Sequence, residues 1–277
     1  MSSEKCDLRF GSILSYVPLK YLEDGAPDAA DLPREERARK GCAKRGIEDR
    51  LCGAMLDSHN IMWHLKSNHV VSGRLIEEDR EVEMSELVAR LTKMVLANEL
   101  GIVSPIDEID WGARFRRLLG EFLVRDALLV PVPPHYSQVK DYPANGGLWV
   151  PDSIAMHMER LGLGRRLVAL QRERAVPKSS TLLKRTERRT TTHYESLRVI
   201  SDEDLNGKRV VLVDDVVTTG STLLGSAWRI LDRYPNAQIV GFAAMRTISD
   251  LHMFRGPLDP VAGCIVHNEN CTTYRRP

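Results

Sequence analysis

The sequence predicts an α/β fold with a central parallel sheet, helices on both faces and an α+β accessory region at the N-terminus. Two observations support this prediction. In the second half of the chain, aliphatic runs that suit buried strands alternate with segments of helical periodicity. The pattern is clearest over residues 209–245, where a strand, an amphipathic helix and a second strand follow one another. Such alternation is typical of parallel sheets, because a crossover must carry the chain back before the next strand begins.

The composition is that of an ordinary globular chain. Hydrophobic residues make up 43% and charged residues 28% of the 277 residues, which is enough for a buried core. The 39 basic and 38 acidic side chains nearly balance, so neither nucleic acid nor an anionic membrane is expected as a main partner. The sequence has no apolar run long enough to cross a membrane, and its polar start is not expected to be a secretory signal. Five scattered cysteines favour free thiols in a reducing cytoplasm over a disulfide framework.

The first 110 residues are expected to form the accessory region, and residues 111–277 the main domain. The boundary is placed in the segment 101–110, which is rich in Gly, Ser, Pro and acidic residues. The expected elements of the accessory region are a strand over 9–18, a charged helix over 33–50 and an amphipathic helix over 84–100. The charged helix mixes both signs, so a solvated surface is the better interpretation than a nucleic-acid contact.

The main domain is expected to alternate between strands and helices. The expected elements are a helix over 111–124, a strand over 127–132, a loop over 135–149, a helix over 152–161 with Asp152 as N-cap, a strand over 180–184, a polar segment over 185–207, a strand over 209–213, a helix over 222–234 and a strand over 238–245. The strand over 127–132 ends at two prolines, which cannot continue it.

A candidate ligand site follows the strand over 209–213. That strand ends in Asp214 and Asp215, and a short loop then leads into the next helix. In open α/β sheets, ligands bind at the carboxyl ends of the strands. The loop presents backbone N–H groups and the positive end of a helix dipole to its surroundings, and both suit a phosphate. Gly220 allows a close approach of the backbone, and hydroxyl donors come from Thr218, Thr219, Ser221 and Thr222.

The two adjacent carboxylates suit a different part of the same ligand. They repel a phosphate, but they can accept hydrogen bonds from the vicinal hydroxyls of a ribose or meet a hydrated Mg²⁺. The site is therefore interpreted as a holder for a 5-phosphoribosyl group. The alternative is an ordinary strand and turn that happen to carry acids.

Residues 210–222, VVLVDDVVTTGST, resemble the signature of type I phosphoribosyltransferases, which bind 5-phosphoribosyl 1-diphosphate (PRPP). The resemblance implies a Rossmann-like core. It also implies that Asp214 and Asp215 hold the ribose 2′- and 3′-hydroxyls and meet Mg²⁺ through water. Thr218–Thr222 would hold the 5′-phosphate, and Val216 and Val217 would also belong to the PRPP-binding residues.

A weaker resemblance, over residues 127–247, is to competence protein F-like phosphoribosyltransferases. It rests on the segments 128–133, 182–186 and 190–198. It implies that the loop beginning at Pro134 holds the pyrophosphate, that Lys184 helps to bind PRPP and that Arg185 serves catalysis. Two features of that family are missing, an arginine near residues 144–148 and an N-terminal zinc ribbon with Cys-x-x-Cys pairs.

The resemblance implies displacement at C1′ of PRPP by a nitrogen acceptor, with pyrophosphate leaving. Basic residues of the segment 185–198 can supply cations and a lid: Arg185, Arg188, Arg189, His193 and Arg198. His193 is also a candidate general acid, although a lone histidine in a polar loop is more often without such a role. Thr218 replaces the aspartate that acts as proton acceptor in hypoxanthine-guanine relatives, and a threonine cannot take that role near neutral pH. The acceptor is therefore left open.

Two other functions compete with the enzyme. One is a non-catalytic regulator that senses PRPP or a nucleotide, and the other is a competence-type or DNA-processing accessory protein. Cys264, His267 and Cys271 have a spacing that can contribute to a zinc site, but a buried cysteine with surface neighbours is the more common meaning of such a pattern. A homodimer also stays open.

Overall fold

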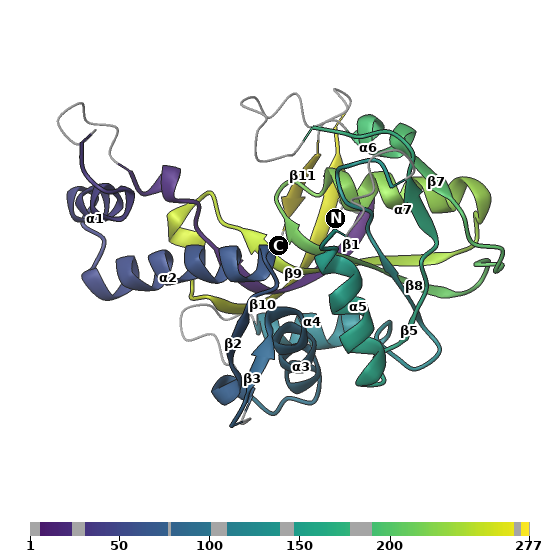
Figure 1. Cartoon of the computed structure of the whole chain (residues 1–277), viewed down its shortest axis with the longest axis horizontal. Helices are drawn as coiled ribbons and strands as arrows, with labels where there is room; N and C mark the ends of the chain where they lie inside the picture. The colour runs from purple at the N-terminus through teal and green to yellow at the C-terminus, as the bar shows by residue number, and fades with distance from the viewer. Residues whose placement is uncertain are drawn as a thin grey trace, which may run out of the picture.

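The computed structural model describes residues 6–23, 31–76, 79–100, 110–138, 147–177, 190–268 and 273–276. A seven-stranded sheet with the order β11-β10-β1-β9-β8-β4-β5 forms its centre (Figure 1). Its strands are β1 (Leu8–Tyr16), β4 (Leu128–Pro131), β5 (Arg165–Arg166), β8 (Arg209–Val217), β9 (Gln238–Thr247), β10 (Leu258–His267) and β11 (Thr273–Arg276). Two small sheets pair β2 (Val70–Ser72) with β3 (Glu81–Glu83), and β6 (Leu170–Arg172) with β7 (Leu197–Val199).

The α/β prediction is confirmed, because five neighbouring strands of this sheet run parallel. They are β1, β9, β8, β4 and β5. The edge beyond β1 differs, since β10 pairs antiparallel with β1 and β11 pairs antiparallel with β10. The helices are α1 (Arg34–Lys44), α2 (Asp49–Lys66), α3 (Met84–Leu96), α4 (Trp111–Gly120), α5 (Val150–Arg160), α6 (Thr190–Ser196) and α7 (Ser221–Arg233), with 3-10 turns η1 (Leu19–Tyr21), η3 (Gly73–Ile76) and η5 (Leu251–Met253).

Helices cover both faces of the sheet. Apolar side chains of α3, α4 and α5 pack on one face, against Val211 and Val213 of β8. Apolar side chains of α7 pack on the other face, where Val210 and Leu212 point. Successive strand residues alternate between faces, so a strand that is buried on both sides needs a continuous aliphatic run, which β8 has.

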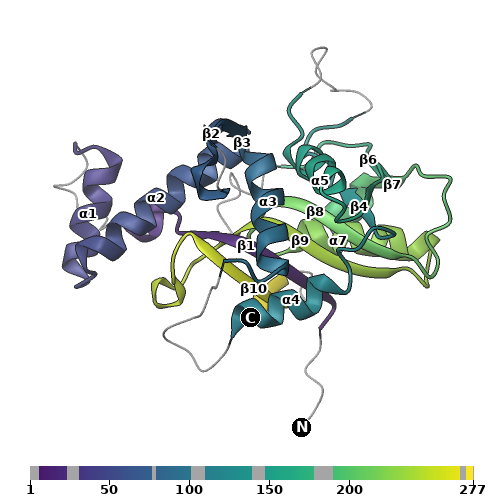
Figure 2. The ribbon, with the colours of Figure 1, turned by 90° about the horizontal axis from the view of Figure 1, so that it is seen from below.

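Helices α1 and α2 extend away from the sheet in both views (Figure 1, Figure 2). Their buried residues form a third core with Val17, Leu19, Ile248 and Phe254, which lie beyond the ends of β1 and β9. Strand β1, which also precedes residue 110, lies inside the main sheet between β10 and β9. A cut at residue 110 would therefore remove a central strand, and the division into two parts describes proposed roles rather than separate cores.

Several local expectations need correction. The helix expected over 33–50 is two helices, because Gly46 has φ +68° and ends the first of them. Asp152 does not cap α5, whose N-cap is Trp149; its carboxylate pairs with Arg166 instead. The polar segment expected after residue 185 contains α6 and β7 in its described part. The strand expected over 180–184 lies outside the described residues.

The expectation of free cysteines is wrong for one pair. Cys6 and Cys264 form a disulfide with a Cα–Cα distance of 5.5 Å, while Cys42 and Cys52 are free and buried. Because Cys264 is bonded to Cys6, it is not available for the zinc site, and Cys271 lies outside the described residues. No group of three or more His, Cys, Asp or Glu side chains with metal-site geometry occurs in the described part of the chain. In that same part, no helix has the length and apolar character needed to cross a membrane.

Candidate functional site

The two acids are the sixth and seventh of the nine residues of β8 and do not follow its end. Asp214 is buried, with 9% of its surface exposed, and Asp215 is partly exposed. The Oδ1 atom of Asp214 accepts a hydrogen bond from the N–H of Asp215 at 2.9 Å. The Oδ1 atom of Asp215 accepts one from the N–H of Val216 at 2.7 Å. These bonds fix both carboxylates and leave the Oδ2 atoms for other partners.

Lys66, the last residue of α2, reaches the acid pair from the accessory region. Its Nζ atom lies 2.7 Å from Oδ2 of Asp215. Burial raises the pKa of the Asp214 carboxyl, the Asp215 carboxylate raises that pKa further, and the Lys66 ammonium opposes both effects. The lysine thus offsets the repulsion between two adjacent acids. Sequence reasoning missed this residue, because nothing in the local pattern of α2 distinguishes it from a surface lysine.

The loop after β8 has the backbone that the sequence predicts. Gly220 has φ +94°, and a Cβ atom at this position would lie 2.6 Å from Cδ1 of Ile265. Only glycine fits such a site without a shift of its surroundings. Gly220 is the N-cap of α7, so the loop ends at the positive end of a helix of 13 residues. That arrangement suits a phosphate group.

The hydroxyls of this loop form a connected group. Thr219 Oγ1 lies 3.0 Å from Ser221 Oγ, and Ser221 Oγ lies 2.7 Å from Thr273 Oγ1 of β11. Thr218 Oγ1 lies 3.5 Å from Thr247 Oγ1 at the end of β9. Thr222, in the first turn of α7, is half-buried. The C-terminal strand therefore supports the loop, a contribution that the sequence pattern did not reveal.

The chain after β4 runs beside the acid pair, because the N–H of Val132 donates to the carbonyl of Val213 at 2.8 Å. Arg172 of β6 fixes this chain through hydrogen bonds to its backbone. Its guanidinium is fully buried and donates to the carbonyls of Pro133 and Pro134 and to Ser196 Oγ. Burial lowers the pKa of Arg172 to about 10. Arg172 is thus a positioning residue for the expected pyrophosphate loop.

Other residues expected in the site are not all brought together. Lys184, Arg185, Arg188 and Arg189 lie outside the described residues, as do Val139–Gly146 of the loop after Pro134. Arg198 is exposed and lies 3.6 Å from a carboxylate oxygen of Glu173.

His193 does not suit the role of general acid. It is buried between α6 and α7, where a Cβ on Gly225 would lie 2.9 Å from the His193 Cβ. Burial, together with the charge of Arg172, lowers the pKa of His193 to about 4. The neutral form therefore dominates near pH 7, and this histidine serves the packing of the two helices.

The strand, acid pair, glycine loop and helix bring together groups of the kind that can hold a phosphorylated ribose. Residues 143–246 match the family model of the phosphoribosyl transferase domain. No curated protein matches the chain. The match extends from the chain after β4 to β9 and includes the acid pair and the loop 218–222.

The phosphoribosyl transferase match, the parallel sheet and its flanking helices together support the type I fold for this part of the chain. The matched segment omits β1, the helices α1 to α4 and the strands β10 and β11. Polar contacts to the candidate site come from these unmatched parts, with Lys66 on Asp215 and Thr273 on Ser221. Elements outside the family match therefore contribute contacts to the candidate site.

Proposed function

We propose that the protein transfers the 5-phosphoribosyl group of PRPP to a nitrogen acceptor, with release of pyrophosphate and dependence on Mg²⁺. The match to the phosphoribosyl transferase domain supports PRPP-dependent phosphoribosyl transfer in general. The observation that carries the finer proposal is the pairing of Asp214 and Asp215 with a glycine loop at a helix N-terminus, all within one strand–loop–helix unit. We also propose that, among phosphoribosyltransferases, the chain is related to the competence protein F-like proteins.

In the proposed reaction, the bond between C1′ and the pyrophosphate oxygen breaks and a bond from C1′ to the acceptor nitrogen forms. The ribose carbon carries positive charge in the transition state, as in other glycosyl transfers. Asp214 and Asp215 hold the ribose hydroxyls and lie near that charge, while the loop 218–222 fixes the 5′-phosphate. Rigid placement of this kind lowers the barrier by reducing the entropy that the reacting groups lose.

The donor set of the acid pair fits Mg²⁺, which prefers carboxylate oxygens and retains several of its waters. Asp214 and Asp215 are the residues proposed to meet it, through water. When bound, the ion would neutralise charge on the departing pyrophosphate. The chain after Pro134 is proposed to bind that pyrophosphate, and Lys184 and Arg185 are proposed to add cations to it.

The best alternative is a regulator that binds PRPP or a nucleotide without catalysis. The contact of Lys66 with Asp215 favours it, because it links the ligand site directly to a part of the chain outside the family match. We propose that the helices within residues 1–110 act as a hood over the acceptor or, in the regulator, as the responding element. A competence-type role in DNA processing has no comparable contact in its favour.

Calorimetry with PRPP, with and without Mg²⁺, tests the binding proposal first. Micromolar binding that needs Mg²⁺ is expected, and a screen of nitrogen acceptors should then yield PRPP-dependent release of pyrophosphate. Binding without release by any acceptor would favour the regulator. Absence of binding by PRPP would contradict the enzyme, and absence of binding by both PRPP and nucleoside monophosphates would contradict the regulator as well.

Replacing Lys66 by methionine is expected to weaken PRPP binding by about three- to tenfold, since one partly exposed positive charge near a highly anionic ligand is lost. The side chain of Lys66 is 44% exposed, and solvent therefore screens its charge and keeps the loss of affinity small. Lys208→Met is the matched control, because it removes the same charge just before the start of β8, at the end opposite to the acids. Tighter binding by Lys66→Met would contradict this expectation and would indicate that the lysine competes with the ribose for Asp215.

A further inference from the structure

Strand β11, at the edge of the sheet, directs an arginine toward the loop 218–222. It pairs antiparallel with β10, and residues opposite each other in such a pair point to the same face of the sheet. Arg275 is opposite Ile265. Ile265 belongs to the core on the α7 face, and a Cβ on Gly220 would lie 2.6 Å from its Cδ1 atom. Arg275 therefore points to the face of the sheet on which the loop lies.

Hydrogen bonds agree with this orientation of β11. Thr273 Oγ1 lies 2.7 Å from the hydroxyl of Ser221 at the start of α7. A guanidinium N–H of Arg275 donates to the carbonyl oxygen of Thr247 at 2.5 Å. The hydroxyl of Thr247 lies 3.5 Å from that of Thr218, the first residue of the loop. The contacts from Arg275 to the loop thus pass through a single residue.

The loop itself has no charged side chain. Residues 218–222 are Thr, Thr, Gly, Ser and Thr, which offer a phosphate only neutral N–H and O–H donors. A phosphate monoester carries about 1.5–2 negative charges near neutral pH. Hydrogen bonds from arginine to such a group are about twice as strong as those between neutral groups. A guanidinium has several N–H donors, so a bond to one carbonyl is compatible with a contact to a phosphate.

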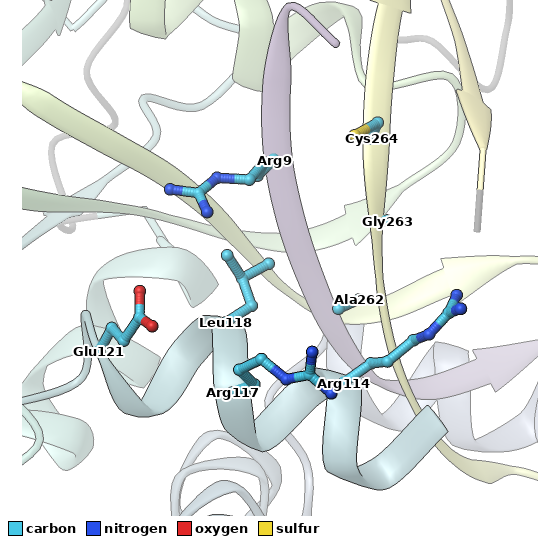
Figure 3. A pocket seen from close by; sticks show the side chains of 8 residues that line it. All are labelled: Arg9, Arg114, Arg117, Leu118, Glu121, Ala262, Gly263 and Cys264. Atoms are coloured by element: carbon cyan, nitrogen blue, oxygen red, sulfur yellow. The ribbon is translucent and has the colours of Figure 1, made fainter. Parts of the chain in front are cut away.

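The next arginine of the same strand lies on the other face. Arg276 is opposite Cys264, and Ala262 and Cys264 line a hollow between β10 and α4 (Figure 3). A guanidinium N–H of Arg276 donates to the hydroxyl of Tyr274 at 2.6 Å. The two adjacent arginines therefore have different surroundings, and Arg275 is the one of the two that faces the loop.

We propose that Arg275 is a further binding residue of the candidate site and contacts the 5′-phosphate of the ligand through its positive charge. This inference rests on the proposed phosphoribosyl function, because it concerns the same ligand. The family match ends at residue 246, so this cation comes from a strand outside the match. In this arrangement the loop supplies neutral donors and the helix dipole, and β11 supplies the countercharge.

Calorimetry of the full chain with ribose 5-phosphate tests the proposal. Arg275→Gln is expected to weaken binding by about tenfold or more, because a charge-assisted hydrogen bond is lost. Arg275→Lys should retain part of the affinity, because the charge remains. Arg276→Gln is the matched control, since it removes the same charge one residue further along the strand but from the other face. Its affinity should stay within about twofold of the wild type.

The pH dependence of binding separates a phosphate contact from a purely structural role. The second pKa of a phosphate monoester is about 6, so the affinity of the wild type should rise between about pH 5 and about pH 7.5 as the dianion forms. In Arg275→Gln this rise should be at least about threefold smaller. Titration of protein groups such as Asp214, whose pKa is raised to about 8, affects both proteins.

A role limited to the bond with Thr247 would lower the affinity of Arg275→Gln equally at both pH values. That result would overturn the proposal, as would an affinity of Arg275→Gln within about threefold of the wild type at neutral pH. PRPP replaces ribose 5-phosphate as the probe if the smaller ligand binds the wild type too weakly to measure. Absence of binding by both probes would overturn the proposal together with the site.

Failure of the proposed enzyme gives a different result. Binding of ribose 5-phosphate that depends on Arg275, without release of pyrophosphate from PRPP by any acceptor, would contradict the enzyme and support the phosphate contact. Release of pyrophosphate by the wild type and by Arg275→Gln with equal KM for PRPP would support the enzyme and overturn the role of Arg275.

Discussion

Converting both acids of β8 to their amides, Asp214→Asn with Asp215→Asn, is expected to weaken PRPP binding by about 100-fold or more. Each carboxylate is proposed to accept a hydrogen bond from a ribose hydroxyl, and a hydrogen bond to a charged group contributes about 1.5–3 kcal/mol. Two such bonds amount to about 3–6 kcal/mol, and each 1.4 kcal/mol is a factor of ten in affinity. Calorimetry or equilibrium dialysis with PRPP measures the loss.

The amide variant is a fair test because it preserves the local structure. An asparagine Oδ1 can still accept the backbone N–H bonds that Asp214 and Asp215 now accept. The change removes the repulsion between adjacent acids and also the partner of Lys66, so the stability should change little. Asp126→Asn is the control. Asp126 is an exposed acid that pairs with Arg209, the first residue of β8, at the end of the strand opposite to Asp214 and Asp215. Affinity within about threefold of the wild type would contradict the assignment of the acids.

The sequence predicted the parts of the fold that are encoded locally. Strand β8, helix α7 and strand β9 appear within a few residues of their expected ends, because each has a strong period of its own. The backbone of the loop 218–222 could also be predicted, because its glycine and the start of the next helix are close in the chain. The acids were also identified, although β8 continues through them to Val217.

The contacts that complete the site join distant parts of the chain. Lys66 meets Asp215 across 149 residues, Thr273 meets Ser221 across 52 and Arg172 meets Pro134 across 38. A one-dimensional pattern shows that these residues are polar but not which of them will meet. The same holds for Cys6 and Cys264, which pair across 258 residues because β1 and β10 lie side by side. Strand β1 itself was recognised, but its place in the middle of the main sheet was not.

Gly220→Ala is expected to reduce both PRPP affinity and stability, and it tests the phosphate loop without touching a polar group. The positive φ of Gly220 costs a non-glycine residue about 1–2 kcal/mol. The added methyl group would also overlap Ile265, and overpacking of a core usually costs about 1–3 kcal/mol more. We therefore expect a loss of about 2–5 kcal/mol in the free energy of unfolding. PRPP binding should weaken by about tenfold or more as the loop shifts.

Gly162→Ala separates the two contributions. Gly162 also has a positive φ, +76°, but no atom lies within 4 Å of its added Cβ. This control should therefore lose only the backbone part, about 1–2 kcal/mol, and should keep its PRPP affinity. Adding Ile265→Ala to Gly220→Ala removes the three side-chain atoms that the methyl group would meet, so it should restore part of the affinity. Equal effects of Gly220→Ala and Gly162→Ala on PRPP binding would show that the close packing of the loop on β10 has no role in holding the phosphate.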